Sequence, residues 1–297
     1  MKDFNFDKLV ELENISVGNN SHSSSQLSDA VDLLFWFDER KEHFPFPTLV
    51  SKGYISSESK EHDVYQMLSS SAKQGSSTLF KSGKLKESQK RETIVAIWQS
   101  VVNFKAEKIE APQFNIHDID FDFINYIATL SVDTENIHDL SNILLSKGII
   151  LIIEPAFPGL GKDGCVYKNK KGNPILALSL RHDRLDNFWF TLLHEISHII
   201  LHYEELDNVI IEDIESVDSN EIEDEANYFT RECIVDRVTW KKFALYKNKS
   251  EKKLYELAQS VKRHPSLIAG RVRFETGDWS LFSDIVHDIS PKEVLGL

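Results

Sequence analysis

The chain has 297 residues, of which 41% are hydrophobic and 27% are charged, and this suits one large soluble domain or two modest ones. Its formal net charge of −13 argues against a nucleic-acid-binding surface, because phosphate neutralisation needs clustered Lys and Arg. The start of the chain lacks the apolar core of a signal peptide, no apolar stretch is long enough for a membrane span, and the only cysteines are Cys165 and Cys233. We therefore expect a cytoplasmic protein with reduced thiols and no membrane attachment.

The first third of the chain predicts helices joined by polar loops. Residues 1–30 begin charged and end in a Ser/Asn-rich stretch, which is typical of a flexible lead-in. Residues 30–44 and 92–109 carry apolar side chains at the spacing of an amphipathic helix, and residues 69–77 are expected to form a loop. We expect residues 1–110 to be a mostly helical region that senses a signal or binds a partner.

A change of pattern in residues 111–297 predicts a second domain of the α+β class. Two helical segments come first. A continuous β-branched run typical of a buried strand follows, and after it an alternating segment and a third segment that also predict strands. The helices are expected at 122–131 and 137–148, the latter closed by Gly148, and the strands at 148–155, 163–169 and 174–180. Helices, then a small sheet, then more helices indicate an α+β fold.

The segment HEISH, residues 194–198, lies in an apolar stretch that predicts a helix, with Asp186 as its expected N-cap. Residues four apart on a helix are about 40° apart around its axis, so His194 and His198 can reach one ion. Glu195 lies at the flank of that face, where it can accept a proton from water without binding the metal. This spacing is what zinc-assisted peptide hydrolysis requires.

A zinc site of this type needs a third protein ligand. His202 lies about 12 Å along a continuous helix from His194, and no glycine breaks the helix between them. It is therefore expected to be a supporting residue or a residue of the helix C-terminus.

The third ligand is expected on a second helix, predicted for residues 220–233. Its predicted apolar stripe consists of four residues: Ile222, Ala226, Phe229 and Cys233. Glu225 lies about 70° from the centre of that stripe, and Glu223 and Glu221 lie about 90–110° away on opposite flanks. A carboxylate bordering a buried face needs a partner, so Glu225 is the predicted ligand, Glu221 the next candidate, and a buried salt bridge the plain alternative.

These segments resemble the ImmA/IrrE family of intracellular metallopeptidases. The resemblance rests on DNFWFTLLHEISHIILH (186–202) followed by EDEANYF (223–229). Segments 44–55, 92–100, 148–180 and 264–277 also resemble the long HigA-like antitoxins that carry this peptidase domain. The resemblance covers roughly residues 30–290 and is strongest in 148–277.

The resemblance implies a zincin-like, specifically gluzincin-like, metallo-endopeptidase. It implies His194, His198 and Glu225 as ligands of zinc or manganese and Glu195 as the general base. Family members commonly cleave a helix-turn-helix repressor encoded beside them and so switch on a stress, phage or toxin–antitoxin response. The chain departs from its HigA-like relatives because residues 1–50 show no helix-turn-helix domain. This favours a separate DNA-binding partner over direct DNA binding.

Two functional hypotheses remain open from the sequence. One is a metal-dependent endopeptidase with a single regulatory substrate, and the other is an antitoxin-like binding module that keeps the metal site but does little catalysis. The group that stabilises the developing oxyanion is unassigned; the candidates by residue type are Tyr203, Tyr228, His264 and Arg271.

Overall fold

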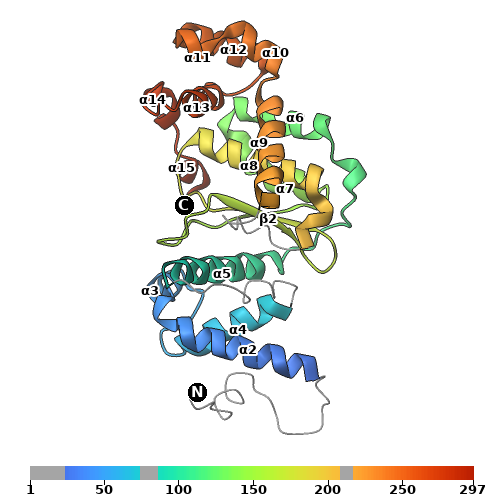
Figure 1. Ribbon diagram of the computed structural model, residues 1–297, viewed down its shortest axis with the longest axis vertical. Helices are drawn as coiled ribbons and strands as arrows, with labels where there is room; N and C mark the ends of the chain where they lie inside the picture. The colour runs from blue at the N-terminus through green and yellow to red at the C-terminus, as the bar shows by residue number, and fades with distance from the viewer. Residues whose placement is uncertain (1–23, 74–85, 208–216) are drawn as a thin grey trace. The chain divides into compact units, whose positions relative to one another are not determined.

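The computed structural model describes residues 24–73, 86–207 and 217–297, which belong to two compact units (Figure 1). One unit is formed by Met1–Lys108 with Ala156–Gly161, and the other by Ile109–Pro155 with Lys162–Leu297. In the described part of the chain, no helix combines the length and apolar character needed to cross a bilayer.

The first unit is helical. Its helices are α2 (Ser24–Arg40), α3 (Phe46–Ser51), α4 (Lys60–Lys73) and α5 (Lys86–Ala106), with a 3₁₀ turn, η1 (Lys41–His43). Helix α2 begins at Ser24, inside the expected lead-in, whose residues 1–23 lie outside the described part of the chain. The expected loop at 69–77 is wrong in its first half, because α4 continues through Ser69 to Lys73. Ser69 and Ser71 are buried there, so packing outweighs their preference for turns.

Helix α5 differs from the predicted amphipathic helix, since every residue of 93–103 is buried. The buried polar residues on it need partners, and Asn103 Nδ2 donates to Ser71 Oγ at 2.6 Å on α4. Ser100 Oγ donates to the Ala96 carbonyl oxygen of its own helix. Local satisfaction of this kind allows a helix to be buried all round without an apolar sequence.

The second unit contains a three-stranded mixed sheet in the order β1–β3–β2. Strand β1 (Ile150–Ile153) pairs in parallel with β3 (Pro174–Leu178), starting at Ile150 opposite Ile175. Strand β2 (Gly164–Lys168) pairs antiparallel with β3, and Cys165 lies opposite Ala177. The central strand β3 is buried at all five positions, as its continuous apolar sequence predicts.

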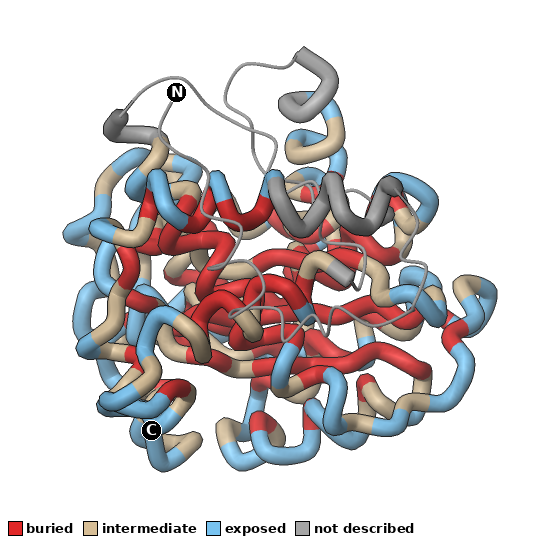
Figure 2. The backbone as a smooth tube through the Cα atoms, turned by 90° about the horizontal axis from the view of Figure 1, so that it is seen from below, coloured by how far each residue is buried: buried red, intermediate tan, exposed pale blue. Residues whose placement is uncertain are grey.

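Helices complete the α+β unit, and most of those labelled in Figure 1 lie on one side of the sheet. In chain order they are η3 (Ile116–Asp118), α6 (Phe121–Thr129), η4 (Leu130–Val132), η5 (Thr134–Asp139), α7 (Leu140–Leu145), α8 (Leu185–His202), η6 (Tyr203–Asp207), α9 (Val217–Ile234), α10 (Arg237–Phe243), α11 (Leu245–Asn248), α12 (Glu251–Val261), α13 (Pro265–Thr276), α14 (Ser283–His287) and α15 (Pro291–Leu295). Helix α8 packs against α9, α13, β2 and β3. Buried positions form continuous stretches of chain, drawn in red in Figure 2.

The turn between α7 and β1 requires a glycine. Gly148 has φ 78°, the left-handed conformation expected of the residue that closes a helix. A Cβ atom at this position would lie 2.8 Å from both Phe114 Cα and the Pro112 carbonyl oxygen. The buried Asn173 side chain donates to the carbonyl oxygens of Pro112 and Gly148 at 2.7 and 2.8 Å. The close packing of Gly148 against the segment of Pro112 and Phe114, together with these two hydrogen bonds, therefore holds the start of the sheet against that segment.

Neither cysteine forms a disulfide and both are buried, and we expect neither to react with a thiol reagent in the native protein. Burial raises the pKa of the Cys233 thiol to about 12, despite the opposing effect of Arg263, and the thiolate is the reactive form. Titration with Ellman's reagent should find almost no thiol in the native protein and the two thiols of the sequence after denaturation. Rapid labelling of the native protein would contradict this burial.

Candidate metal centre and active-site helix

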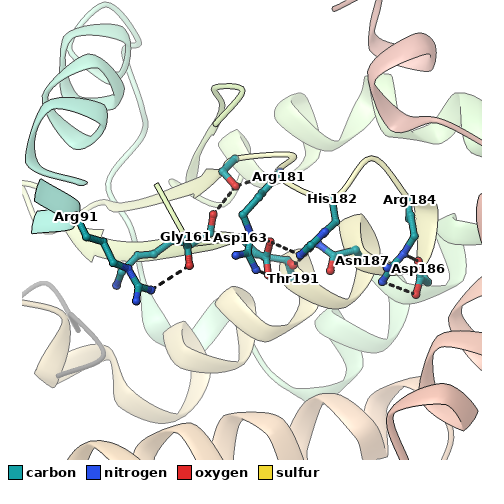
Figure 3. A network of polar contacts seen from close by, with 11 residues as sticks. Arg91, Gly161, Asp163, Arg181, His182, Arg184, Asp186, Asn187 and Thr191 are labelled. Carbon is teal, nitrogen blue, oxygen red and sulfur yellow. Dashed lines mark hydrogen bonds and ion pairs between the residues drawn. The ribbon is translucent and has the colours of Figure 1, made fainter. Parts of the chain in front are cut away.

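Helix α8 carries the HEISH motif, and two arginine–aspartate pairs lie near its start, one at the helix N-terminus and one between the segments that flank the sheet (Figure 3). Arg181 binds Asp163 through two hydrogen bonds of 3.0 and 3.1 Å, joining the segments that precede β2 and follow β3. Arg184 binds Asp186 in the same two-fold manner, at 3.0 and 3.3 Å. The expected N-cap is wrong: Arg184 is the N-cap residue, and Asp186 lies in the first turn, where its charge favours the helix dipole.

The two histidines of the motif point toward the same place from successive turns of α8. Their Nε2 atoms are 3.0 Å apart, and their rings meet edge to face with centroids 4.6 Å apart. The side chain of His198 is 3% exposed and that of His194 is 14% exposed. Both histidines therefore present Nε2 to one small, largely buried space.

Glu223 on α9 supplies the third group of this cluster. Its Oε2 lies 3.1 Å from His194 Nε2, and its Oε1 lies 3.3 Å from His198 Nε2. One ligand atom from each of the three residues lies within 4.8 Å of the others. Among the described residues, this is the one group of three or more His, Cys, Asp or Glu side chains that could hold a metal ion.

Glu225, the carboxylate favoured from the sequence, is not part of this cluster, and Glu223 takes its place. The Glu225 side chain is 68% exposed, and its Oε2 lies 3.0 Å from His202 Nε2. Glu221, the second candidate, is exposed.

The error comes from the apolar stripe assumed for α9. Ile222 and Phe229 are only partly buried, whereas Ala226, Thr230 and Cys233 are 0–3% exposed. At about 100° per residue, the stripe formed by these three buried residues places Glu223 about 55° from its centre and Glu225 about 105° away. The sequence signal that was missed is the polar residue Thr230, which belongs to the buried face.

Thr230 is buried because its hydroxyl has partners on both helices. Thr230 Oγ1 donates to the Ala226 carbonyl oxygen at 2.8 Å and lies 2.9 Å from Ser197 Oγ. Ser197 Oγ also lies 2.8 Å from the Leu193 carbonyl oxygen on α8. Because each hydroxyl has a single hydrogen, Ser197 donates to Thr230 when Thr230 donates to Ala226. This hydroxyl pair links the HEISH turn of α8 to α9, seven residues after Glu223, and so helps to set the register that brings Glu223 to the histidines.

The charge states of the cluster suit a cation. Burial alone would raise the pKa of Glu223, but its hydrogen-bonding contacts with His194 and His198 outweigh burial and hold the pKa well below its usual range. Burial lowers the pKa of His198, and the favourable contact with Glu223 only partly opposes that effect. At neutral pH the cluster therefore offers a carboxylate and a neutral imidazole, the forms in which these side chains bind metals.

The separations between the three side chains also fit one zinc ion. Ligand atoms about 2.0–2.1 Å from a tetrahedral zinc are about 3.3 Å from one another. The two Nε2 atoms are 3.0 Å apart and His194 Nε2 lies 3.1 Å from Glu223 Oε2, both close to this spacing, while His198 Nε2 lies 3.3 Å from the other carboxylate oxygen, Oε1. The donor set of two imidazole nitrogens and one carboxylate is that of a catalytic zinc site, which keeps its fourth position for water or substrate.

Comparison with known families agrees with this geometry. Residues 147–271 match the IrrE N-terminal-like domain, a peptidase family. The chain carries an IrrE N-terminal-like metallopeptidase domain. The match contains the sheet, the HEISH helix and Glu223, and it coincides with the strongest part of the resemblance seen in the sequence. No curated protein and no solved structure matches the chain.

Glu195, the predicted general base of the IrrE-like domain, is held at the start of β2. Its side chain is buried, and a Cβ atom added at Gly164 would lie 2.8 Å from Glu195 Oε1 and 2.7 Å from Thr191 Cγ2. Gly164 thus leaves the space that the Glu195 carboxylate occupies. No local pattern in the sequence marks this glycine, because its role depends on the packing of β2 against α8.

Replacing Gly164 with Ala is expected to lower peptidase activity while leaving metal content unchanged. The added methyl group must displace Glu195 or Thr191, and a misplacement of about 1 Å at a catalytic group costs on the order of 100-fold in rate. Metal analysis and cleavage kinetics on the same sample would separate the two effects.

A suitable control for this substitution is Gly270→Ala on α13. A Cβ atom there would lie 2.8 Å from Asp186 Oδ2, so the variant introduces comparable crowding at the other end of α8. We expect Gly270→Ala to reduce stability by about 1–3 kcal/mol with little change in cleavage per folded molecule. A Gly164→Ala enzyme with full activity would contradict the positioning role of Gly164.

Three of the four oxyanion-donor candidates have structural partners. The Tyr203 hydroxyl donates to the Gly172 carbonyl oxygen, the His264 side chain caps α13, and Arg271 donates to the carbonyl oxygens of Arg231 and Val235. The fourth, Tyr228, lies half exposed on α9. These contacts assign no member of the set to the oxyanion.

Proposed function

We propose that the protein is a metal-dependent endopeptidase whose substrate is a separately encoded DNA-binding regulator of the helix-turn-helix type. The observation that carries the catalytic part is the cluster of His194, His198 and Glu223 on the same helix pair as Glu195. Zinc is the proposed ion, because two imidazoles and one carboxylate are its usual catalytic ligands, and manganese is the alternative.

The chain's residues divide the chemistry between them. When bound, the metal ion would supply a nucleophile from water near neutral pH and polarise the scissile carbonyl group. His194, His198 and Glu223 would hold it, and the carboxylate of Glu195 would accept the proton of the attacking water and pass it to the departing amine. The buried position of Glu195 beside Gly164 supports a fixed carboxylate, as proton transfer in a defined geometry requires.

The proposed substrate is supported by charge as well as by the family resemblance. A DNA-binding regulator carries a basic surface, whereas this chain has a net charge of −13. Opposite charges accelerate the encounter of two proteins. The same acidity disfavours a direct role of this chain on DNA, which supports a partner that is encoded separately.

The test uses the full-length protein and a small helix-turn-helix protein encoded by a neighbouring reading frame. Zinc-loaded protein should convert this regulator into discrete fragments, identified by mass spectrometry, and a chelator should stop the reaction until zinc is restored. Tight binding without cleavage would overturn the endopeptidase proposal and favour the antitoxin-like binding module. If the regulator is neither bound nor cleaved, the proposed substrate class is overturned.

A further inference from the structure

A second line of contacts leaves the metal cluster on the side away from Glu223. His198 Nδ1 lies 3.3 Å from His202 Nδ1, and His202 Nε2 lies 3.0 Å from Glu225 Oε2. His202 is 5% exposed, so its ring nitrogens depend on these protein partners. His198 and His202, one turn apart on α8, and Glu225 on α9 thus form a hydrogen-bonded chain. It runs from the exposed carboxylate of Glu225 to the buried imidazole of His198.

The carboxylate determines the direction of the hydrogen bonds in this chain. An ionised Glu225 accepts only, so His202 Nε2 carries the hydrogen that it donates. A neutral His202 then has a lone pair on Nδ1, which accepts from His198 Nδ1–H. His198 is left with its lone pair on Nε2, the atom that faces His194 and Glu223.

The opposite direction leaves a conflict in the chain. If His198 Nε2–H donated to Glu223, then His198 Nδ1 would accept from His202 Nδ1–H. The lone pair of His202 Nε2 would then face the Glu225 carboxylate at 3.0 Å. Glu223 and Glu225 therefore favour opposite tautomers of His198, and only the tautomer favoured by Glu225 can bind a metal through Nε2.

We propose that His202 and Glu225 are positioning residues that hold His198 in the tautomer whose Nε2 lone pair faces the metal. This inference rests on the metal site of the proposed function. Partners of this kind orient a metal-binding histidine and raise its basicity. The exposed carboxylate of Glu225 on α9 would thus act on the metal ion through two intervening residues, His202 and His198.

Two substitutions of His202 test the proposal through metal affinity, measured by competition with a chromogenic zinc chelator. His202→Leu keeps an apolar side chain in the buried position but removes the acceptor, and it should weaken zinc binding by about 10–100-fold. His202→Asn places Oδ1 where Nδ1 was, and its amide oxygen accepts without help from Glu225. Binding close to that of the wild type is expected for His202→Asn.

Substitution of Glu225 reverses the proposed direction. In Glu225→Lys an ammonium group faces His202 Nε2 and can only donate, so zinc affinity should fall toward that of His202→Leu. Asp224→Lys is the matched control, because Asp224 is also exposed on α9 and the charge change is identical. In the His202→Asn background, Glu225→Lys should lower zinc affinity no more than Asp224→Lys does.

The tautomer itself can be observed by ¹⁵N NMR of the histidine rings in metal-free protein. The wild type and His202→Asn should show His198 protonated at Nδ1, and Glu225→Lys should shift it toward Nε2. Equal zinc affinity for Glu225→Lys and Asp224→Lys, with unchanged ¹⁵N shifts, would overturn the positioning role. Wild-type protein that binds no zinc would instead overturn the metal site, so the two failures are distinguishable.

Discussion

Replacing Glu195 with Gln should abolish cleavage of the partner protein while the metal remains bound. Glutamine keeps the shape that fits beside Gly164, but its amide cannot accept the proton of the attacking water. A positioned general base contributes about 10²–10⁴-fold to the rate, and the loss should appear in single-turnover cleavage. Metal content, measured by elemental analysis, should stay near one equivalent, as a single site of this type holds.

The matched control for this variant is Glu221→Gln, an identical change at an exposed position of α9. It should retain full cleavage and full metal content. Unchanged cleavage by Glu195→Gln would remove the assigned base and with it the metallo-endopeptidase mechanism. Loss of metal in Glu195→Gln would instead place this side chain among the ligands.

Removing Glu223 should have the largest effect on metal binding among the acidic residues of α9. Glu223→Ala leaves two imidazoles without their carboxylate, and we expect a loss beyond the about 10–100-fold typical of supporting residues. Glu225→Ala should cost only about two- to fivefold, the range of an exposed ion pair, because it removes the preference for one tautomer of His202, whereas Glu225→Lys reverses that preference. Zinc titration followed by competition with a chelator would rank the two variants.

Thermal unfolding gives a second measure of the same difference. A ligand present at about 100 times its dissociation constant stabilises the native state by about 2.7 kcal/mol. Zinc should therefore raise the melting temperature of the wild type and of Glu225→Ala, but not that of Glu223→Ala. A zinc response that is lost in Glu225→Ala and kept in Glu223→Ala would restore the ligand set first expected from the sequence.

The parts of the fold that the sequence predicted are those with a strong local pattern. The three strands follow from short apolar or alternating segments and α8 from a longer apolar stretch, and the two histidines of the cluster follow from their spacing on one helix. Gly148 could be assigned because a left-handed residue after a helix has few alternatives. In each case neighbouring residues carry the information.

The parts that escaped prediction depend on contacts between segments that are distant in sequence. Thr230 is polar by type, so its residue type does not predict a place on the buried face of α9, although its hydroxyl has hydrogen-bond partners in Ala226 and Ser197. Without Thr230, the centre of the predicted stripe lies closer to Glu225 than to Glu223. Gly164 likewise has no local signal, since its importance lies in the Glu195 side chain that packs over it.

The burial of α8 has a consequence for regulation. Most of its residues are buried, including Glu195 and His198, and a helix packed on several sides opens only when much of its domain unfolds. Local fluctuations of α8 are therefore too costly to switch the peptidase on and off. We therefore expect control to act on what reaches the helix, through substrate access or metal supply, while the catalytic residues stay in place.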